Sequence, residues 1–281
     1  MMLKIVMDSA GEIPDEWRKE YDVVVIPVNI QFENKTYLQG IDLSNDDFYH
    51  LADSTGVIPK TSQPTPQQFV ELYRKIAKAS DTILSLHVTS KLSGTFNSAV
   101  LAAKEVKGKL KVIPFDSGSG SAAIGFMCKE VRQLERAGAT LQAILDRLEE
   151  IRQNLSIVLT LDTLEYAQKS GRVKKLQAAI ATLINIKPII ILKDGALDMK
   201  ERVRTRQRAI SRVVEIIHER VGDHLVNVAV VHAQSLDAAK LLIQKVHETL
   251  HVNELILSDL SIGVAANLGP GTIGVIAYAV A

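Results

Sequence analysis

The first half of the chain alternates short β-branched runs with longer segments of helical period, and this alternation constrains the fold more than any other feature of the sequence. Strands that alternate with helices form parallel sheets, because each helix carries the chain back to the edge where the next strand starts. An apolar helix face is indicated by the i, i+3, i+4, i+7 spacing of Phe96, Ala99, Val100 and Ala103. We expect five strands in this half, at residues 3–7, 23–30, 82–88, 110–115 and 156–161.

The start of one helix is specified closely by the local sequence. Thr65 can act as the N-cap, Pro66 occupies the first helical position, where its missing N–H costs nothing, and Gln68 stands three residues after the cap. Thr and Gln at this spacing form a capping box, in which each side chain accepts a hydrogen bond from the other residue's backbone N–H. We therefore expect a helix to begin at Pro66.

The pattern changes after residue 162. A helical pair is interrupted at Ser170-Gly171, and the apolar run at residues 188–192 ends in the turn-forming pair Asp194-Gly195. Asp-Gly between two strand-like runs is a strong hairpin signal, and a hairpin pairs its strands antiparallel. We expect a mixed sheet here, continuing through a basic helix at 205–220, a helix at 235–251 and strands at 227–232, 255–258 and 272–280.

The length of 281 residues favours two domains, since a domain typically contains ~100–200 residues. The predicted fold class is α/β with two domains. The N-terminal domain, residues 1–160, has a mostly parallel sheet flanked by helices. The C-terminal domain, residues 161–281, is mixed α/β and contains the hairpin.

Charge and composition narrow the classes of partner. The chain carries 33 Lys and Arg against 32 Asp and Glu, so no global attraction draws it to nucleic acid or to an acidic membrane surface. No apolar run approaches the ~20 residues that span a bilayer, and the start of the chain does not resemble a signal peptide. Its single cysteine, Cys128, has no partner for an internal disulfide. We expect a cytoplasmic protein without nucleic-acid partners or stable membrane insertion.

Ligands of open parallel sheets bind beyond the carboxyl ends of the strands, and in this chain those positions carry hydroxyl groups. Helix capping alone is the preferred interpretation for Ser9, Ser117 and Thr163. The segment Ser93-Gly94-Thr95 differs, because it opens a helix whose free N–H groups and dipole favour an anion, and its glycine lets a ligand approach the backbone. We favour anion binding for this segment.

The loop from Pro59 to Pro64 is the second candidate binding segment. Its two prolines fix φ and hold the hydroxyls of Thr61 and Ser62 in place. Considered alone, these residues support a stiff connector and a ligand-binding loop equally.

Two glycine patterns suggest nucleotide binding but fail the test of context. The glycines within residues 269–274 are followed by strand-like sequence instead of a helix. Those within residues 118–123 follow a strand and open a helix, but the nearest acid at a comparable distance, Glu135, lies in the same helical segment. A dinucleotide enzyme is a disfavoured alternative, and neither a P-loop nor a nucleophile elbow occurs.

Seven histidines are scattered along the chain without the spacing of metal ligands, so no metal site is expected. His87 and His232 stand near strand ends and could serve Ser93 as a general base, since triad residues come from distant parts of a sequence. A serine-dependent acyl hydrolase that uses Ser93 is therefore the main alternative function.

A basic cluster spans residues 200–212 and is opposed within that range only by Glu201. It is either a solvated surface or a docking surface for an acidic or phosphate-bearing partner. Its members are Lys200, Arg202, Arg204, Arg206, Arg208 and Arg212.

Taken together, these segments resemble the DegV family. The likeness extends over almost the whole chain, and the segments Thr61-Ser62-Gln63-Pro64 and Leu92-Ser93-Gly94-Thr95 in that order are specific. The other matching segments are Asp8-Ser9 with Ile13-Pro14, Asp116-Ser117, Ser170-Gly171-Arg172, Asn185-Ile186-Lys187-Pro188, Val203-Arg204-Thr205 and Gly269-Pro270-Gly271 with Ile273-Gly274.

The resemblance implies an α/β protein that buries one long-chain fatty acid between its two domains, the C-terminal domain closing over the acyl chain. It also implies the acyl-binding subunit of a bacterial fatty acid kinase, in which a separate catalytic subunit brings ATP and phosphorylates the carboxylate. This chain would then hold no catalytic residue, no metal and no cofactor besides the fatty acid. Thr61 and Ser93 would hydrogen-bond the carboxylate, with Ser62, Gly94 and Thr95 close by.

Two positions depart from the pattern of the family. Asn267 stands where members commonly have a histidine, and it can donate a hydrogen bond to the carboxylate but cannot supply a titrating positive charge. Gln39 stands where an aspartate is usual. On the surface, Arg172, Arg202 and Arg204 are expected to face the kinase.

The chemistry of a fatty acid agrees with a site of this kind. Each buried methylene contributes ~0.8 kcal/mol, so a tail of about 14 to 18 carbons contributes on the order of 10 kcal/mol before ordering costs. The tail can supply the affinity, and the carboxylate needs only neutral donors, which bond more strongly to an anion than to a neutral group.

Overall fold

The computed structural model describes residues 2–174 and 186–280. The chain divides into two compact units, the first formed by Met1–Arg152 with Ser261–Gly263 and the second by Gln153–Leu260 with Val264–Ala281. Each unit has its own central sheet and its own hydrophobic core. The predicted α/β fold class is confirmed.

The first unit is built on a four-stranded sheet in the order β2-β1-β6-β7, in which every pair is parallel. The central strands β1 and β6 are almost entirely buried, as expected for β-branched runs covered on both faces. These strands are β1 (Leu3–Asp8), β2 (Val23–Ile26), β6 (Thr82–His87) and β7 (Lys111–Asp116).

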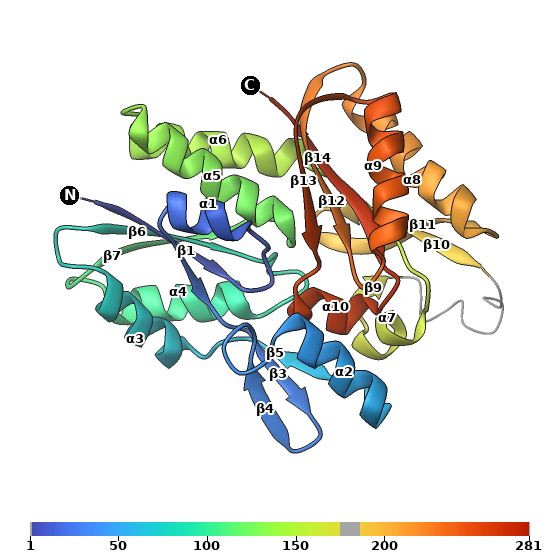
Figure 1. Cartoon of the computed structure of the whole chain (residues 1–281). Coiled ribbons are helices and arrows are strands. Elements are labelled where there is room, and N and C mark those ends of the chain that lie inside the picture. The colour runs from blue at the N-terminus through green and yellow to red at the C-terminus, as the bar shows by residue number, and fades with distance from the viewer. Residues whose placement is uncertain (1, 175–185, 281) are drawn as a thin grey trace. The chain divides into compact units, whose positions relative to one another are not determined.

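Helices cover both faces of this sheet (Figure 1). On one face, Phe69 and Tyr73 of α3 (Pro66–Ile76) pack with Ala99 of α4 (Thr95–Glu105) against Val6 and Ile83. On the other face lies α5 (Ala122–Arg136), beside α6 (Leu141–Asn154). The short helix α1 (Asp15–Glu20) connects β1 to β2.

The capping box at the start of α3 is confirmed. The Thr65 hydroxyl accepts the N–H of Gln68 at 3.2 Å, and the Gln68 side-chain oxygen accepts the N–H of Thr65 at 2.8 Å. The start of this helix determines where the preceding loop, residues 59–64, joins the unit.

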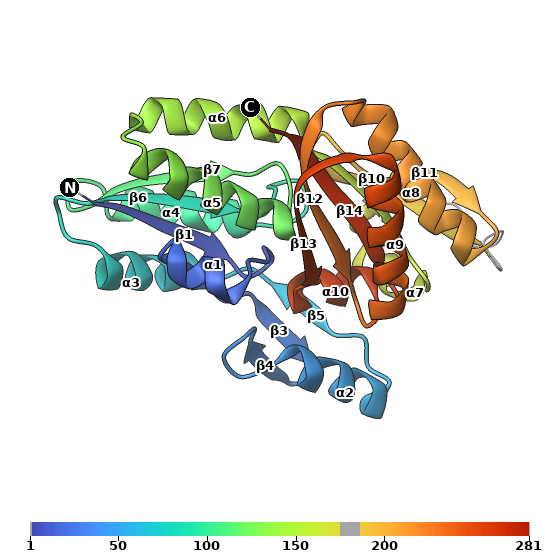
Figure 2. The same cartoon turned by 45° about the horizontal axis from the view of Figure 1, so that its top comes forward.

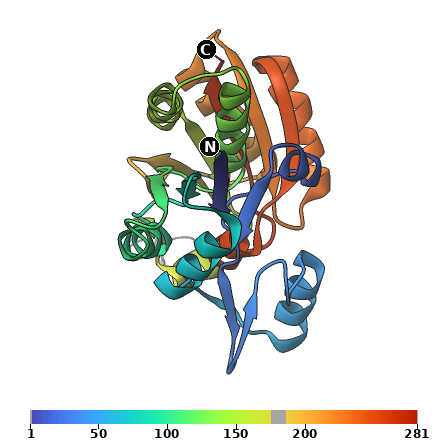
Figure 3. The same cartoon turned by 90° about the vertical axis from the view of Figure 1, so that its left-hand side faces the viewer.

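The predicted strand at residues 23–30 is interrupted at Pro27, which has no N–H to donate to a ladder. The chain leaves the parallel sheet there, and β3 (Asn29–Phe32) pairs antiparallel with β4 (Lys35–Leu38) and β5 (Lys60–Ser62). Together with α2 (Asn45–Thr55), this small sheet stands apart from the four-stranded sheet (Figure 3). The sequence analysis missed it because strands of three or four residues are too short to show a period.

The second unit contains a seven-stranded mixed sheet in the order β13-β12-β14-β8-β10-β11-β9. The run that the sequence analysis placed in the parallel sheet, β8 (Ser156–Thr160), belongs here and pairs antiparallel with β14 and β10. A continuous buried run indicates a central strand but not which sheet it joins. The other strands are β9 (Val173–Lys174), β10 (Lys187–Lys193), β11 (Ala196–Val203), β12 (Leu225–His232), β13 (His251–Asp259) and β14 (Ile273–Ala279).

The hairpin at Asp194-Gly195 is confirmed. β10 and β11 pair antiparallel up to Lys193 and Ala196, and the two turn residues have φ of 50° and 75°. Positive φ at both central positions is the requirement of a type I′ turn, which Asp-Gly meets.

The helices α8 (Arg206–Val221) and α9 (Leu236–Thr249) pack on one face of this sheet (Figure 2), and their apolar side chains form its core with β12 and β14. The shorter helices are α7 (Glu165–Ser170), which ends at Gly171 with φ of 69°, and α10 (Ile262–Leu268). The second helix expected after Ser170-Gly171 lies outside the described residues. No helix within residues 2–174 and 186–280 combines the length and apolarity needed to cross a bilayer.

Gly125 lies where α5 packs against the segment after β1. A Cβ at this position would lie 2.2 Å from the carbonyl oxygen of Glu12, far inside van der Waals contact. Gly125→Ala is therefore expected to lower the free energy of unfolding by about 2–3 kcal/mol, although alanine normally stabilises a helix interior. Gly120→Ala is the matched control, because a Cβ there meets nothing closer than Val88 at 3.4 Å. Equal thermal unfolding midpoints for the two variants would contradict this prediction.

Candidate ligand-binding site

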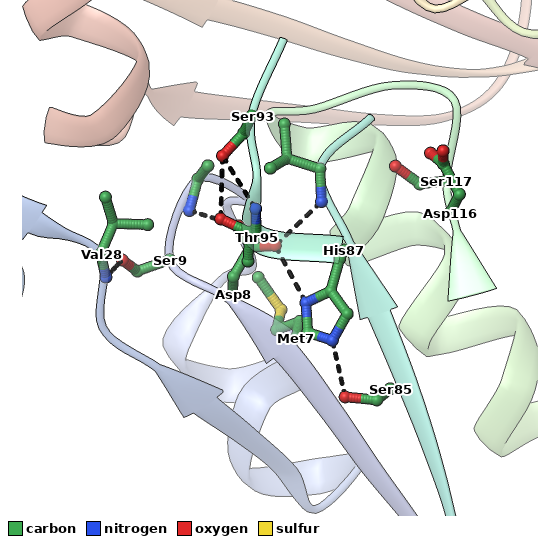
Figure 4. Close-up of polar contacts among 12 residues, drawn as sticks. Met7, Asp8, Ser9, Val28, Ser85, His87, Ser93, Thr95, Asp116 and Ser117 are labelled. Atoms are coloured by element: carbon green, nitrogen blue, oxygen red, sulfur yellow. Dashed lines mark hydrogen bonds and ion pairs between the residues drawn. The ribbon is translucent and has the colours of Figure 1, made fainter. Parts of the chain in front are cut away.

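Polar loops follow β1, β6 and β7 at one edge of the parallel sheet, because parallel strands end on the same side. The last residues of these strands are Asp8, His87 and Asp116. Figure 4 draws them together with the hydroxyl residues Ser93 and Thr95.

Ser93 and Thr95 form a pair of hydroxyls at the start of α4. Their oxygens lie 2.9 Å apart, and the Ser93 oxygen also accepts the N–H of Thr95 at 3.3 Å (Figure 4). Ser93 is half-buried and Thr95 is buried. Because one hydroxyl of the pair donates to the other, one hydroxyl proton of the pair is left to offer to an anion.

The two loops that the sequence analysis selected lie side by side. A Cβ on Gly94 would lie 2.9 Å from the side-chain nitrogen of Gln63, so glycine is needed for this close approach. Residue Thr61 is half-buried and pairs across the small sheet with the buried Ile30, whereas Ser62 is exposed on the opposite face. The loop expected at residues 59–64 is thus partly a strand, β5.

Ser9 and Ser117 do not cap helices, contrary to the expectation from sequence. The Ser9 hydroxyl accepts the N–H of Val28 at 2.8 Å, and the Ser117 hydroxyl accepts the N–H of Ser119 at 3.2 Å. Both therefore hold loop backbone in place. Thr163 does accept an N–H at the start of α7, from Glu165 at 3.4 Å.

The Asp116 carboxylate bonds the backbone of two loops. It accepts the N–H of Ser90 at 3.2 Å and the N–H of Gly118 at 2.9 Å. The glycine-containing segment that follows β7 therefore uses backbone donors in internal contacts, and this disfavours the nucleotide interpretation further.

His87 is not available as a base for Ser93. Its side chain is fully buried, and its two ring nitrogens lie 2.7 Å from the Ser85 hydroxyl and 3.1 Å from the Asp8 carboxylate. Within the described part of the chain, no histidine hydrogen-bonds Ser93. The structure thus gives no support to the hydrolase alternative.

Glu12 is a buried carboxylate that the sequence analysis did not select. It is 8% exposed, and its two oxygens accept the N–H of Ser261 at 2.6 Å and the hydroxyl of Ser121. Burial raises the pKa of Glu12 to about 7, partly offset by these hydrogen bonds. Ser121 has φ of 60° and ψ of −153°, a conformation that residues other than glycine rarely adopt. Only the burial of Glu12 marks it as unusual, and burial of a loop residue cannot be predicted from the periodicity of the sequence.

Gln39 has a clear structural role. Its side-chain nitrogen donates to the carbonyl oxygen of Ser9 at 2.7 Å, and its side-chain oxygen accepts the N–H of Gly263 at 2.9 Å. A carboxamide can donate and accept at once, whereas an ionised carboxylate can only accept.

Asn267 and Arg172 both contact Ser170 within the second unit. The Ser170 hydroxyl donates to the carbonyl oxygen of Asn267 at 3.1 Å, and the Arg172 guanidinium donates to the carbonyl oxygen of Ser170 at 2.6 Å. These contacts connect the end of α7 to the end of α10. They leave the carboxylate-binding role of Asn267 a prediction.

Three cations of the basic cluster, Lys200, Arg208 and Arg212, form ion pairs with acids of α8 that lie outside residues 200–212. Arg212 contacts Glu201 at 2.8 Å, Glu219 at 2.7 Å and Glu215 at 3.1 Å. Arg208 contacts Glu215 at 2.6 Å. Spacings of three and seven residues on α8 place Glu215 and Glu219 on the same helix face as these arginines. Glu201 is the one acid within residues 200–212, as the sequence shows, and the additional acids come from later turns of α8.

Strand β11 contains a β-bulge at Lys200. The pairing register shifts there, so that Lys200 reaches Glu219 of α8 and Glu201 reaches Arg212. Arg202 and Arg204 are exposed, and neither forms an ion pair with another described residue. Arg206 also forms no ion pair among the described residues, but it is half-buried and donates to the carbonyl oxygen of Gly271.

Comparison with known proteins agrees with this architecture. A family model described as "Uncharacterised protein, DegV family" matches residues 2–280. The chain is 32% identical over 277 residues to Protein DegV of Bacillus subtilis, covering 98% of each. It is 31% identical over 278 residues to a DegV domain-containing protein of Halalkalibacterium halodurans, again covering 98% of each.

Solved structures share the whole fold. A DegV family protein from Thermus thermophilus, described by its fatty acid binding, matches with a TM-score of 0.92 at 30% identity and 100% coverage of both chains. DegV of Bacillus subtilis, described as a fatty acid binding protein, matches with a TM-score of 0.89 at 31% identity and 99% coverage of both. The fold defines an α/β protein with one parallel and one mixed sheet, of a kind found in bacteria. The chain belongs to the DegV family, and the resemblance read from its motifs is confirmed.

The raised pKa of Glu12 predicts a measurable pH dependence of stability. Between the ordinary value of 4.5 and about 7 the folded chain holds this proton more tightly than the unfolded chain does, so the contribution of Glu12 to stability falls as pH rises through that range. Glu12→Gln removes the charge and keeps an acceptor for Ser261. Above pH 7 the variant is expected to be more stable than the wild type by on the order of 3 kcal/mol.

The measurement is chemical denaturation of both proteins at pH 5 and pH 8. The proton-linked advantage of Glu12→Gln should shrink toward pH 5, where the wild-type carboxyl is protonated. An advantage that stays constant between the two pH values would contradict the prediction.

Proposed function

We propose that this protein binds one long-chain fatty acid in a buried pocket and presents its carboxylate to a separate ATP-dependent kinase subunit in the cytoplasm. The Ser93 and Thr95 hydroxyls beside the Thr61–Gln63 segment are the observation that carries the proposal. Relatives at 30% and 31% identity that share the whole fold are described as binding fatty acids, which supports it.

The head-group chemistry follows from the donors in the first unit. The Ser93–Thr95 pair has one hydroxyl proton to donate, and the start of α4 adds the positive end of a helix dipole. Thr61 would supply a second hydroxyl, with Ser62 and Gly94 nearby. These neutral donors orient a carboxylate, and no base lies within hydrogen-bond distance of Ser93 among the described residues. The site therefore suits binding without hydrolysis.

Asn267 is a further proposed donor to the carboxylate. The carboxamide of Asn267 adds one more neutral donor. Since the head is held by hydroxyl and amide groups, most of the affinity comes from burial of the tail, at ~0.8 kcal/mol per methylene.

Two exposed arginines, Arg202 near the end of β11 and Arg204 just after it, support presentation to a kinase. A subunit that carries ATP brings a strongly negative ligand, and Arg202 and Arg204 are cations that no acid of the described chain neutralises. Arg172 would extend the same surface. Arginine pairs with phosphate through two parallel hydrogen bonds, which suits this role.

The head-group assignment predicts the effect of removing two hydroxyls. Thr61→Val and Ser93→Ala are each expected to weaken retention of the fatty acid about tenfold, the loss of one hydrogen bond to a charged group. Organic extraction and mass spectrometry should release about one fatty acid per chain from the wild type and less from each variant. Thr36→Val, in the same small sheet, and Ser54→Ala, in α2, are exposed controls that should retain lipid. Wild-type extracts without lipid would contradict the proposed function, and full retention by both site variants would contradict the placement of the head.

The partner surface is tested with the arginines. Arg202→Ala and Arg204→Ala should leave fatty-acid retention unchanged and lower acyl-phosphate formation about tenfold when kinase subunit and ATP are added, since each removes an interaction with a charged partner. Arg208→Ala is the control, because Arg208 is held by Glu215 at 2.6 Å. Equal rates for all three variants would show that β11 does not face the kinase.

A further inference from the structure

Four buried side chains form one continuous chain of hydrogen bonds, and Figure 4 shows the part of it from Ser85 through His87 to Asp8. The Tyr73 hydroxyl lies 2.9 Å from the Ser85 hydroxyl, which lies 2.7 Å from Nε2 of His87. Nδ1 of His87 lies 3.1 Å from the Asp8 carboxylate. All four residues are 0% exposed, and the Phe69 ring packs edge-on against the His87 ring.

The hydrogen bonds of this chain have one direction. When Nδ1–H of His87 donates to Asp8, Nε2 is an acceptor and receives the Ser85 proton, and Ser85 in turn accepts the Tyr73 proton. Every donor then has an acceptor, and the series ends on a carboxylate. The reverse direction leaves the Tyr73 proton without an acceptor among these four groups.

Ser85, His87 and Asp8 follow each other as in a hydrolase triad, but this arrangement cannot act on a ligand. The Ser85 hydroxyl is buried and bonded to Tyr73. A nucleophile needs access to the reacting carbon, and Ser85 has none. The network must therefore act through the backbone that it holds.

That backbone leads to Ser93. The Asp8 carboxylate accepts the N–H of Val88 at 2.8 Å and the N–H of Ala10 at 3.0 Å. The next residue, Thr89, accepts the N–H of Ser93 at 3.2 Å through its carbonyl oxygen. Val88, which Asp8 binds, is therefore the direct neighbour of Thr89, which binds the backbone of Ser93.

The other end of the network leads to the second binding segment. Tyr73 belongs to α3, which starts four residues after β5 and so follows Thr61 and Ser62 directly along the chain. The hydrogen bond between Tyr73 and Ser85 joins α3 to β6. Both segments with candidate carboxylate donors are therefore connected to one buried network.

We infer that Asp8 and His87 are positioning residues for the ligand carboxylate, which they set in place by holding the Val88–Ser93 turn against the segment before α3. The inference rests on the proposed function and names side chains that do not touch the ligand. Its consequence is selectivity for an ionised head group over a neutral one of equal chain length.

The test compares the affinity for palmitate with that for hexadecanol, which shares the tail and lacks the carboxylate. The wild type should prefer palmitate at least about tenfold, because hydrogen bonds to a charged group are the stronger ones. Asp8→Asn, which places an amide NH₂ against backbone N–H groups, and Ser85→Ala, which cuts the network, should each reduce this preference about fivefold or more. Affinity for hexadecanol should stay within about twofold of the wild type, because the tail contacts are unchanged.

Tyr278→Phe is the matched control. Tyr278 is also a buried tyrosine, 1% exposed, whose hydroxyl accepts a hydrogen bond from Asn227 at 2.9 Å in the second unit. Loss of this phenol should leave the preference for palmitate unchanged. A purely structural role of the network would lower both affinities in proportion and leave their ratio intact.

The outcomes separate the two proposals. An unchanged ratio in folded Asp8→Asn and Ser85→Ala proteins would overturn the positioning role while leaving fatty-acid binding in place. If Asp8→Asn does not fold, Ser85→Ala and Tyr73→Phe decide the question by the same ratio. A wild type that binds neither probe would overturn the proposed function and this inference with it, whereas a wild type that binds both equally would overturn this inference and the head-group assignment.

Discussion

The Asp8 carboxylate is the acceptor on which the polar edge of the first unit depends. It is fully buried at the end of β1, between β2 and β6, and it accepts hydrogen bonds from two backbone N–H groups and from His87. A buried charge is tolerated only where donors surround it, so these bonds fix the course of the loops after β1 and β6 together. Asp116 does the same for the loops after β6 and β7.

The carboxylates and the hydroxyls at this edge of the sheet have different roles. Asp8 and Asp116 take backbone N–H groups and hold the loops in position. Ser93 and Thr95, which bond each other, keep a hydroxyl proton for a ligand at the start of α4. In the proposed function, such a site would recognise an anion by orientation with little net charge of its own and would leave most of the binding free energy to an apolar tail. A fatty acid combines those two parts in one molecule.

Much of the candidate site could be predicted from short segments, because capping boxes, turn pairs and helix starts depend on neighbours in the chain. The capping box at Thr65, the turn at Asp194-Gly195 and the helix start at Thr95 are of this kind. Glu12 could not be predicted, because its role comes from burial against α5 and from Ser261, 249 residues away. The ion pair of Arg212 with Glu201 has a related cause, since it required knowing that β11 lies beside α8.

By itself the sequence determined the parallel strands of the first unit, the hairpin of the second, the family and the segments that carry hydroxyls. These follow from local propensity and period, which act over a few residues. Only the tertiary structure decided that β8 pairs with β14 and β10, that Pro27 redirects the chain into a separate small sheet, and that Gln63 lies against Gly94. These pairings depend on which buried surfaces pack together. A run of apolar residues indicates that a segment will be buried, but it does not indicate which strand or helix the segment will pack against.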